Sequence, residues 1–175
     1  MKTDHHICVV TVTYGNRWKY LSKMLDRILE MQEFFNINIV VVDNTGHDNI
    51  VNLVKSKNKD IHIIDMHGNT GSAAGFKAGI KYAHRIICTD FVWLLDDDNL
   101  PERSSISSLL QEYENLGSDA NNAFLSMRSD RDQLKKAIFE KKSIKLRPNT
   151  FLGFSLSNKL LTKNNINDSE NNACI

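Results

Sequence analysis

The sequence predicts an α/β fold in which a mainly parallel sheet lies between two layers of helices. Strand-like and helix-like patterns alternate along the chain, and the strand-like runs are almost wholly apolar. A strand that is apolar on both faces needs cover on both, which crossover helices provide in a parallel sheet. With 175 residues, 41% of them hydrophobic and 25% charged, the chain fits one Rossmann-like domain.

The first third of the chain predicts a strand–helix–strand unit. β-branched runs indicate strands at 6–14 and 37–44. Between them, apolar side chains recur at helical spacing, at Trp18, Leu21, Leu25 and Ile28. Because parallel strands need a crossover connection, we expect this helix to cover one face of the sheet.

The next segment repeats the alternation. "DIHIIDM" at 60–66 predicts a third strand, and "FVWLL" at 91–95 a fourth. The segment 71–86 between them predicts a helix, with one face formed by Ala73, Phe76, Ile80 and Ala83.

Beyond Pro101 the pattern predicts one more amphipathic helix, ending near Gly117 and carrying Ile106, Leu109, Leu110 and Tyr113. Further strands are expected at 122–129 and 149–157. We expect a single domain over 1–163, followed by a polar, Asn-rich, disordered tail at 164–175.

Charge and cysteine content narrow the function. The net charge of +1, without a Lys/Arg block, argues against nucleic acid as a partner. No apolar run reaches the roughly 20 residues of a membrane span, and the polar start "MKTDHH" does not resemble a signal peptide. The cysteines, at Cys8, Cys88 and Cys174, lack paired spacing, which favours reduced thiols and a cytoplasmic location.

Polar side chains collect where the predicted strands end. The four strand ends lead into "TVTYGNR", "DNTG", "HGNTGSAAG" and "DDDN". Because the carboxyl ends of parallel strands meet at one edge of a sheet, we expect these segments to share one crevice, where ligands of such folds bind. Taken singly, Asp43 is equally well explained as a turn or cap residue, and for Asn69 that explanation is the better one.

The run of three aspartates is harder to explain as a turn. Neighbouring carboxylates repel each other unless a cation or polar ligand lies among them. If the strand stayed extended, Asp96 and Asp98 would point to one side and Asp97 to the other. Such a pair suits Mg²⁺ or Mn²⁺ bound together with a diphosphate. "GNTGSAAG" is neither a Walker loop nor a dinucleotide fingerprint, which argues against ATP hydrolysis and NAD binding.

In this order and spacing, "VVTVTYGNR", "VVVDNTG", "GNTGSAAGFKAGI" and "WLLDDDNLPE" resemble the nucleotide-binding half of family 2 glycosyltransferases with the A-type fold. The resemblance covers residues 6–116 and looks most like the branch with rhamnosyl- and galactofuranosyl-transferases. "TFLGFSLSNKLL" is weakly similar to a later strand that leads towards the acceptor site.

The resemblance implies a role for each matching residue. The first loop would border the nucleotide base and diphosphate, and Asp43 would contact the base or ribose. The turn that contains Asn69 and Gly71 would lie beside the nucleotide sugar. In the triplet, Asp96 would touch ribose or sugar and share the metal with Asp98. The substrate-binding set is Thr13, Tyr14, Arg17, Asp43, Asn69, Gly71, Asp96 and Asp97.

The implied function is transfer of a sugar from a nucleoside diphosphate sugar, with UDP or dTDP as nucleotide, to a glycan or lipid-linked acceptor. Mg²⁺ or Mn²⁺ would assist by neutralising the leaving group. We expect no membrane span, and peripheral association with a membrane stays open.

The sequence departs from the family in its later half, where we identify no general base and expect the acceptor half to be truncated. The acidic residues there lie in a charged stretch or in the polar tail: Asp130, Asp132, Glu140, Asp168 and Glu170. The alternative is therefore an inactive donor-binding domain. A sugar-phosphate nucleotidyltransferase would need a Gly-rich, basic loop after the first strand, and "TYGNRW" has one Gly.

Overall fold

The computed structural model describes residues 4–46, 48–115 and 117. The chain divides into two units, one ending at Ser105 and one beginning at Ile106, and each is described by itself. The strands expected at 122–129 and 149–157, and the tail at 164–175, lie outside the described residues.

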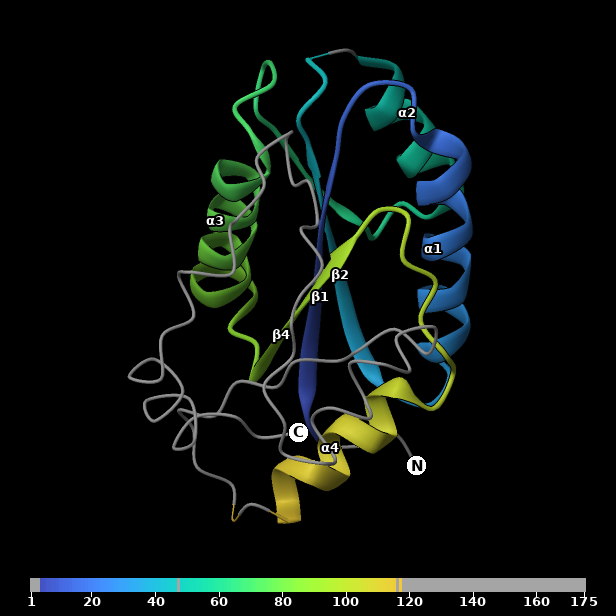
Figure 1. The fold of residues 1–175 in the computed structure, drawn as a ribbon, viewed down its shortest axis with the longest axis vertical. Helices are drawn as coiled ribbons and strands as arrows, with labels where there is room; N and C mark the ends of the chain where they lie inside the picture. Colours follow the sequence, from blue (N-terminus) through green and yellow to red (C-terminus); the bar gives the residue numbers. More distant parts are fainter. Residues whose placement is uncertain (1–3, 47, 116, 118–175) are drawn as a thin grey trace, which may run out of the picture. The chain divides into compact units, whose positions relative to one another are not determined.

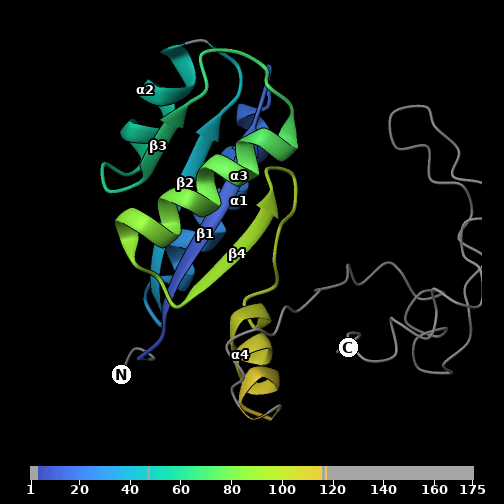
Figure 2. The same cartoon turned by 90° about the vertical axis from the view of Figure 1, so that its left-hand side faces the viewer.

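The first unit contains a four-stranded sheet in the order β3-β2-β1-β4, in which every neighbouring pair is parallel (Figure 1, Figure 2). Its strands, within a residue or two of the expected ranges, are β1 (His6–Thr13), β2 (Asn36–Asp43), β3 (His62–Asp65) and β4 (Phe91–Asp96). The predicted α/β class with a parallel sheet is confirmed.

Helices cover both faces of this sheet. Figure 2 shows α3 in front of the strands and α1 behind them. The helices of this unit are α1 (Trp18–Met31), α2 (Asp48–Lys57), α3 (Ser72–Tyr82) and a π-helical turn, η1 (Ala83–Ile87). The sequence interpretation missed α2, which buries Ile50 and Val54, one turn apart.

The helix α1 follows its predicted stripe. Its buried side chains are Leu21, Met24, Leu25, Ile28 and Met31. They recur every three or four residues, so one continuous apolar face meets the sheet.

The predicted face of α3 is wrong in part. Ile80 is 38% exposed, and the fully covered positions of α3 are Gly75 and Gly79. A Cβ atom at Gly79 would lie 2.3 Å from Cγ1 of Val10, and one at Gly75 would lie 2.8 Å from Cγ1 of Val12. The helix backbone therefore lies directly on β1, closer than any side chain would allow.

The second unit contributes α4 (Ser105–Asn115) to the described residues. It begins four residues after Pro101, and Ser105 N donates a hydrogen bond to the carbonyl of Glu102 (3.0 Å). Ile106 is its buried residue. In the described part of the chain, we find no helix with the length and apolarity needed to cross a membrane.

Candidate functional site

The aspartate triplet follows β4 at the carboxyl edge of the sheet, but the strand does not stay extended through it. β4 ends at Asp96, and Asn99 N donates to the carbonyl of Asp96 (3.1 Å), which closes a tight turn. Asp96 and Asp98 are exposed on this turn, whereas Asp97 retains only 3% of its accessible surface. One of the three carboxylates is therefore directed into the protein.

Buried Asp97 accepts hydrogen bonds from Thr13, at the end of β1, and from Arg17, in the loop between β1 and α1. Its Oδ2 accepts from Thr13 Oγ1 (2.8 Å), and its two oxygens accept from Nε of Arg17 (2.8 and 2.9 Å). A further contact joins Arg17 Nη2 to Asp97 Oδ1 (2.8 Å). Such charge-assisted, bidentate bonds are among the stronger ones in proteins, and they leave Asp97 little capacity for a ligand.

Arg17 also reaches the exposed part of the triplet. Its Nη2 donates to Asp98 Oδ2 (2.7 Å), and Asp98 keeps half of its side chain exposed. The guanidinium lies 5.1 Å from the ring centre of Tyr14 and 5.6 Å from that of Tyr20. The hydrogen bond with Asp97 is the main cause of a raised pKa of Arg17. Tyr20 was not among the predicted residues.

Asp96 is the least compensated carboxylate of the triplet. Partial desolvation by the surrounding protein raises its pKa above the ordinary value, although the side chain reaches the surface. The charges of Asp98 and Asp97 raise the pKa further, and Arg17 acts in the opposite direction. A cation beside Asp96 would relieve this repulsion.

Asp43 ends strand β2, which is separated from β4 by β1, and is completely buried. Its Oδ1 accepts from the backbone N (2.8 Å) and Oγ1 (2.5 Å) of Thr45. Its Oδ2 is buried without a hydrogen-bond partner among the described residues. A buried, unpaired carboxylate oxygen is costly, so this atom is suited to accept from a ligand.

The loop before α3 is tied to the end of β2 by Asn44, a residue that the sequence interpretation did not single out. Buried Asn44 accepts through Oδ1 from the backbone N and Oγ1 of Thr70 (3.0 Å each) and donates to Asn69 Oδ1 (3.3 Å). Asn69 Oδ1 also accepts from Gly71 N (3.0 Å). Gly71 has φ 84°, in the left-handed region that favours glycine.

The predicted residues thus form two groups at one edge of the sheet. The first loop contacts the triplet directly, through Thr13 and Arg17. Asn69 and Gly71 form the second group, next to Asp43 through Asn44. The ladder between β1 and β2 pairs Thr13 with Asp43, so one rigid register relates both groups.

No cluster of three or more His, Cys, Asp or Glu side chains arranged to hold a metal is found among the described residues, and the predicted metal site is a pair, Asp96 and Asp98. The candidates weighed for the general base, from Asp130 to Glu170, lie outside the described ranges.

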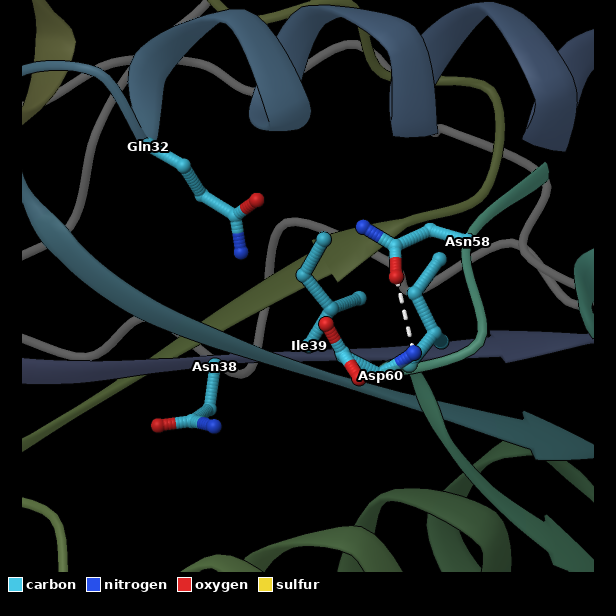
Figure 3. Close-up of a pocket in the computed structure, with 6 residues that line it drawn as sticks. Gln32, Asn38, Ile39, Asn58 and Asp60 are labelled. Atoms are coloured by element: carbon cyan, nitrogen blue, oxygen red, sulfur yellow. Dashed lines mark hydrogen bonds between the residues drawn. The ribbon is translucent and has the colours of Figure 1, made fainter.

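A small pocket lies away from this edge, beside the amino-terminal half of β2 (Figure 3). Its volume of about 30 Å³ is lined by Gln32, Asn38, Ile39, Asn58, Asp60 and Ile61. Asp60 N donates to Asn58 Oδ1 (2.7 Å) beside it. This space suits a water molecule but is far too small for a nucleotide.

Comparison with known proteins finds a matching family model and a similar curated protein. The model of glycosyl transferase family 2 matches residues 8–165. A galactofuranosyltransferase, GlfT1 of Mycolicibacterium smegmatis, is 30% identical over 104 residues, which make up 59% of this chain and 33% of that protein. The chain therefore spans about a third of the length of this relative.

Solved structures share the fold. A fragment (1–349) of S. aureus TarS superimposes with a TM-score of 0.50 at 20% identity, over 63% of this chain and 32% of that one. A mannosyltransferase from Pyrobaculum calidifontis, solved with GDP-Man and Mn²⁺, gives 0.53 at 19% identity, over 63% and 33%. With the family model covering most of the sequence and the fold agreeing, the chain belongs to glycosyl transferase family 2.

Proposed function

We propose that this chain binds a nucleoside diphosphate sugar at the carboxyl edge of its sheet, for transfer of the sugar to a glycan or lipid-linked acceptor. The observation that carries the proposal is Oδ2 of Asp43, a buried oxygen without a partner among the described residues. It lies on the same edge as the exposed Asp96 and Asp98. A base or ribose that donates a hydrogen bond would satisfy Asp43, and a diphosphate would lie towards the triplet.

The donor set of the triplet fits Mg²⁺ or Mn²⁺. These cations prefer carboxylate oxygen, and Mg²⁺ needs only one or two protein carboxylates when phosphates and water supply the rest. Asp96 and Asp98 are exposed and carry a net negative charge despite the contact of Arg17 with Asp98, whereas Asp97 is buried and held by Arg17. A bound cation would supply charge neutralisation for the departing diphosphate. The absence of a third ligand in the described residues is compatible with this arrangement.

Each group of residues would have its own task. Asp43 would orient the nucleoside, since its position is fixed by the β1–β2 register. Asn44, Asn69 and Gly71 would hold the loop before α3 in a shape that admits the nucleotide sugar.

The nucleotide we favour is UDP or dTDP. A structure of the TarS fragment was solved with UDP, and the Pyrobaculum enzyme was solved with a GDP sugar, so proteins with this fold have been solved with different bases. The titration below therefore includes GDP as a third nucleotide. We assign no general base, so transfer is tested separately from donor binding.

The experiment is calorimetric titration of the whole chain with UDP, dTDP and GDP, in Mn²⁺ and in excess EDTA. We expect binding of one pyrimidine nucleotide in Mn²⁺ and much weaker binding in EDTA. Asp43→Ala should weaken that binding by about 1 to 3 kcal/mol, the usual cost of losing a buried hydrogen-bond partner.

The matched control is Asp90→Asn, because Asp90 lies just before β4, at the opposite edge, and its Oδ2 accepts from His6 N (2.8 Å). This variant should bind nucleotide like the wild type. Binding of no nucleotide under any condition would refute the proposal, and equal binding in EDTA would refute its metal part. Release of nucleoside diphosphate from a sugar donor, with and without acceptor glycans, then measures transfer.

A further inference from the structure

The contacts of Arg17 with the triplet are unequal. Towards Asp97, Arg17 makes several short contacts, and that carboxylate is 4% exposed. Towards Asp98 it makes one contact of 2.7 Å, and that carboxylate is 50% exposed. A buried, bidentate pair is hard to break, whereas an exposed single ion pair contributes little to stability.

The surroundings of Arg17 hold the guanidinium in place when the weaker contact opens. The rings of Tyr14 and Tyr20 lie 5.1 and 5.6 Å from it, and Thr13 Oγ1 also donates to Oδ2 of its partner Asp97. Release of Asp98 therefore needs no movement of the arginine backbone. A turn of the exposed Asp98 side chain is sufficient.

The charge balance points the same way. The three carboxylates and Arg17 together carry a formal charge of −2, because one of the three negative charges is cancelled permanently by Arg17. A divalent cation would neutralise what remains. A cation that binds Asp98 through Oδ2, however, competes with Nη2 of Arg17 for that oxygen.

We propose that Arg17 is a resident counter-ion of the site: it keeps Asp97 as a fixed support and holds Asp98 until a divalent cation displaces it there. The inference rests on the proposed function, since it assumes that Asp98 takes part in cation binding. It assigns Asp97 and Arg17 to positioning rather than to direct contact with the donor. Arg17 thereby sets how tightly the site binds its cation before nucleotide arrives.

The test measures Mn²⁺ binding to the whole chain without nucleotide, from the electron paramagnetic resonance signal of free Mn²⁺. Arg17→Gln should bind Mn²⁺ about twofold to fivefold more tightly than the wild type. This factor corresponds to the free energy of one exposed ion pair. Asp97→Asn should bind Mn²⁺ more weakly, because Arg17 then has Asp98 as its remaining carboxylate partner in the triplet.

The double variant Asp97→Asn/Arg17→Gln separates the alternatives. Its formal charge at the cluster equals that of the wild type, and its Asp98 is released, so Mn²⁺ affinity should return to the wild-type value or exceed it. If Asp97 were itself a cation ligand, the double variant would bind as weakly as Asp97→Asn. If Arg17 served only to keep the turn in shape, Arg17→Gln would bind more weakly; either result overturns the inference.

The control is Arg103→Gln, which removes one positive charge from an exposed pair with Glu30 (2.8 Å) and should leave Mn²⁺ affinity unchanged. Thermal unfolding reports which variants fold. If Arg17→Gln does not fold because Asp97 is left unpaired, the double variant carries the comparison. If neither wild type nor variants bind Mn²⁺, the inference is wrong, while nucleotide binding in the calorimetric titration still decides the proposed function independently.

Discussion

Thr11 and Thr13 lie two residues apart on the same face of β1 and are both fully buried, yet their hydroxyl groups differ in partners. Thr13 Oγ1 donates to Asp97, whereas Thr11 Oγ1 has no hydrogen-bond partner among the described residues. Thr11 lies between Val41 and Leu95 in the ladder, so its hydroxyl is surrounded by apolar strand positions. The same side chain therefore supports the site at one position and costs stability at the other.

We predict opposite effects for the same substitution at these two positions. Thr11→Val replaces an unpaired hydroxyl by a methyl group and should raise the free energy of unfolding by about 1 kcal/mol. Thr13→Val removes a donor from buried Asp97 and should lower it by about 1 to 3 kcal/mol. Urea unfolding of the two variants checks both signs, and each serves as the other's control for the loss of a hydroxyl. Equal losses would show that Thr11 has a partner.

The contact of α3 with the sheet predicts a steric effect at Gly79. Gly79→Ala would place a Cβ atom 2.3 Å from Cγ1 of Val10 and 3.2 Å from Cγ2 of Val42. We expect a loss of about 1 to 3 kcal/mol in the free energy of unfolding, despite the better helix propensity of Ala. Lys77→Ala, at an exposed position of the same helix, should change it by less than about 0.5 kcal/mol.

A second variant shows whether the clash with Val10 is the cause. In Gly79→Ala/Val10→Ala the obstructing methyl groups are absent, so the double variant should lose clearly less than the sum of the two single losses. Strict additivity in chemical unfolding would contradict the close approach of α3 and β1.

The link between β2 and the loop before α3 predicts a local effect of Asn44. Asn44→Ala removes the acceptor used by Thr70 and the donor to Asn69, so the free energy of unfolding should fall by about 1 to 3 kcal/mol. The amide of Thr70 should also exchange with deuterium faster, as followed by nuclear magnetic resonance. Asn52→Ala, on the exposed side of α2, is the control. Unchanged exchange at Thr70 would argue against this link.

Buried Cys8 predicts a dependence of stability on alkaline pH. Burial raises the pKa of its thiol from 9.0 to about 12, so the folded state keeps the proton while the unfolded state loses it above pH 9. The contribution of this thiol is complete below pH 9 and is lost as pH rises towards 12. Between these values, wild type should lose about 1.4 kcal/mol per pH unit relative to Cys8→Ala.

The measurement is urea unfolding of wild type and Cys8→Ala at pH 8, 9.5 and 10.5. Taking the difference between the two proteins cancels the titration of the other groups. Cys88→Ala, which removes an exposed thiol, is the control. Parallel pH profiles for wild type and Cys8→Ala would mean that the thiol reaches solvent in the folded protein.

The strands could be predicted from the sequence because their β-branched runs are buried on both faces, as for Ile39, Val40, Val41 and Val42. The helix α2 was missed, since two buried side chains are too few to produce a clear period. The face of α3 was misjudged because it meets the sheet through Gly75 and Gly79, and hydrophobic periodicity cannot detect a contact made by residues without side chains.

The strand ends alone predicted the edge of the sheet at which the candidate site lies, but they did not predict which of its residues contact each other. Arg17 bonds Asp97 although the two residues are 80 positions apart, and sequence spacing does not reveal such a contact. Likewise, the structure is needed to show that Oδ2 of Asp43 is unpaired, because Thr45 bonds only Oδ1. Asn44 had a visible signal, an amide directly after a buried strand, but it was not weighed as a link between loops.

The pairing of Arg17 with buried Asp97 also restricts how this protein can evolve. A substitution that removes only Arg17 leaves the buried charge of Asp97 unpaired. One that removes only Asp97 leaves Arg17 with Asp98 as its remaining carboxylate partner in the triplet. Lineages that change one position are expected to change the other soon afterwards. Positions 17 and 97 should therefore covary among homologues, although 79 residues of independent sequence separate them.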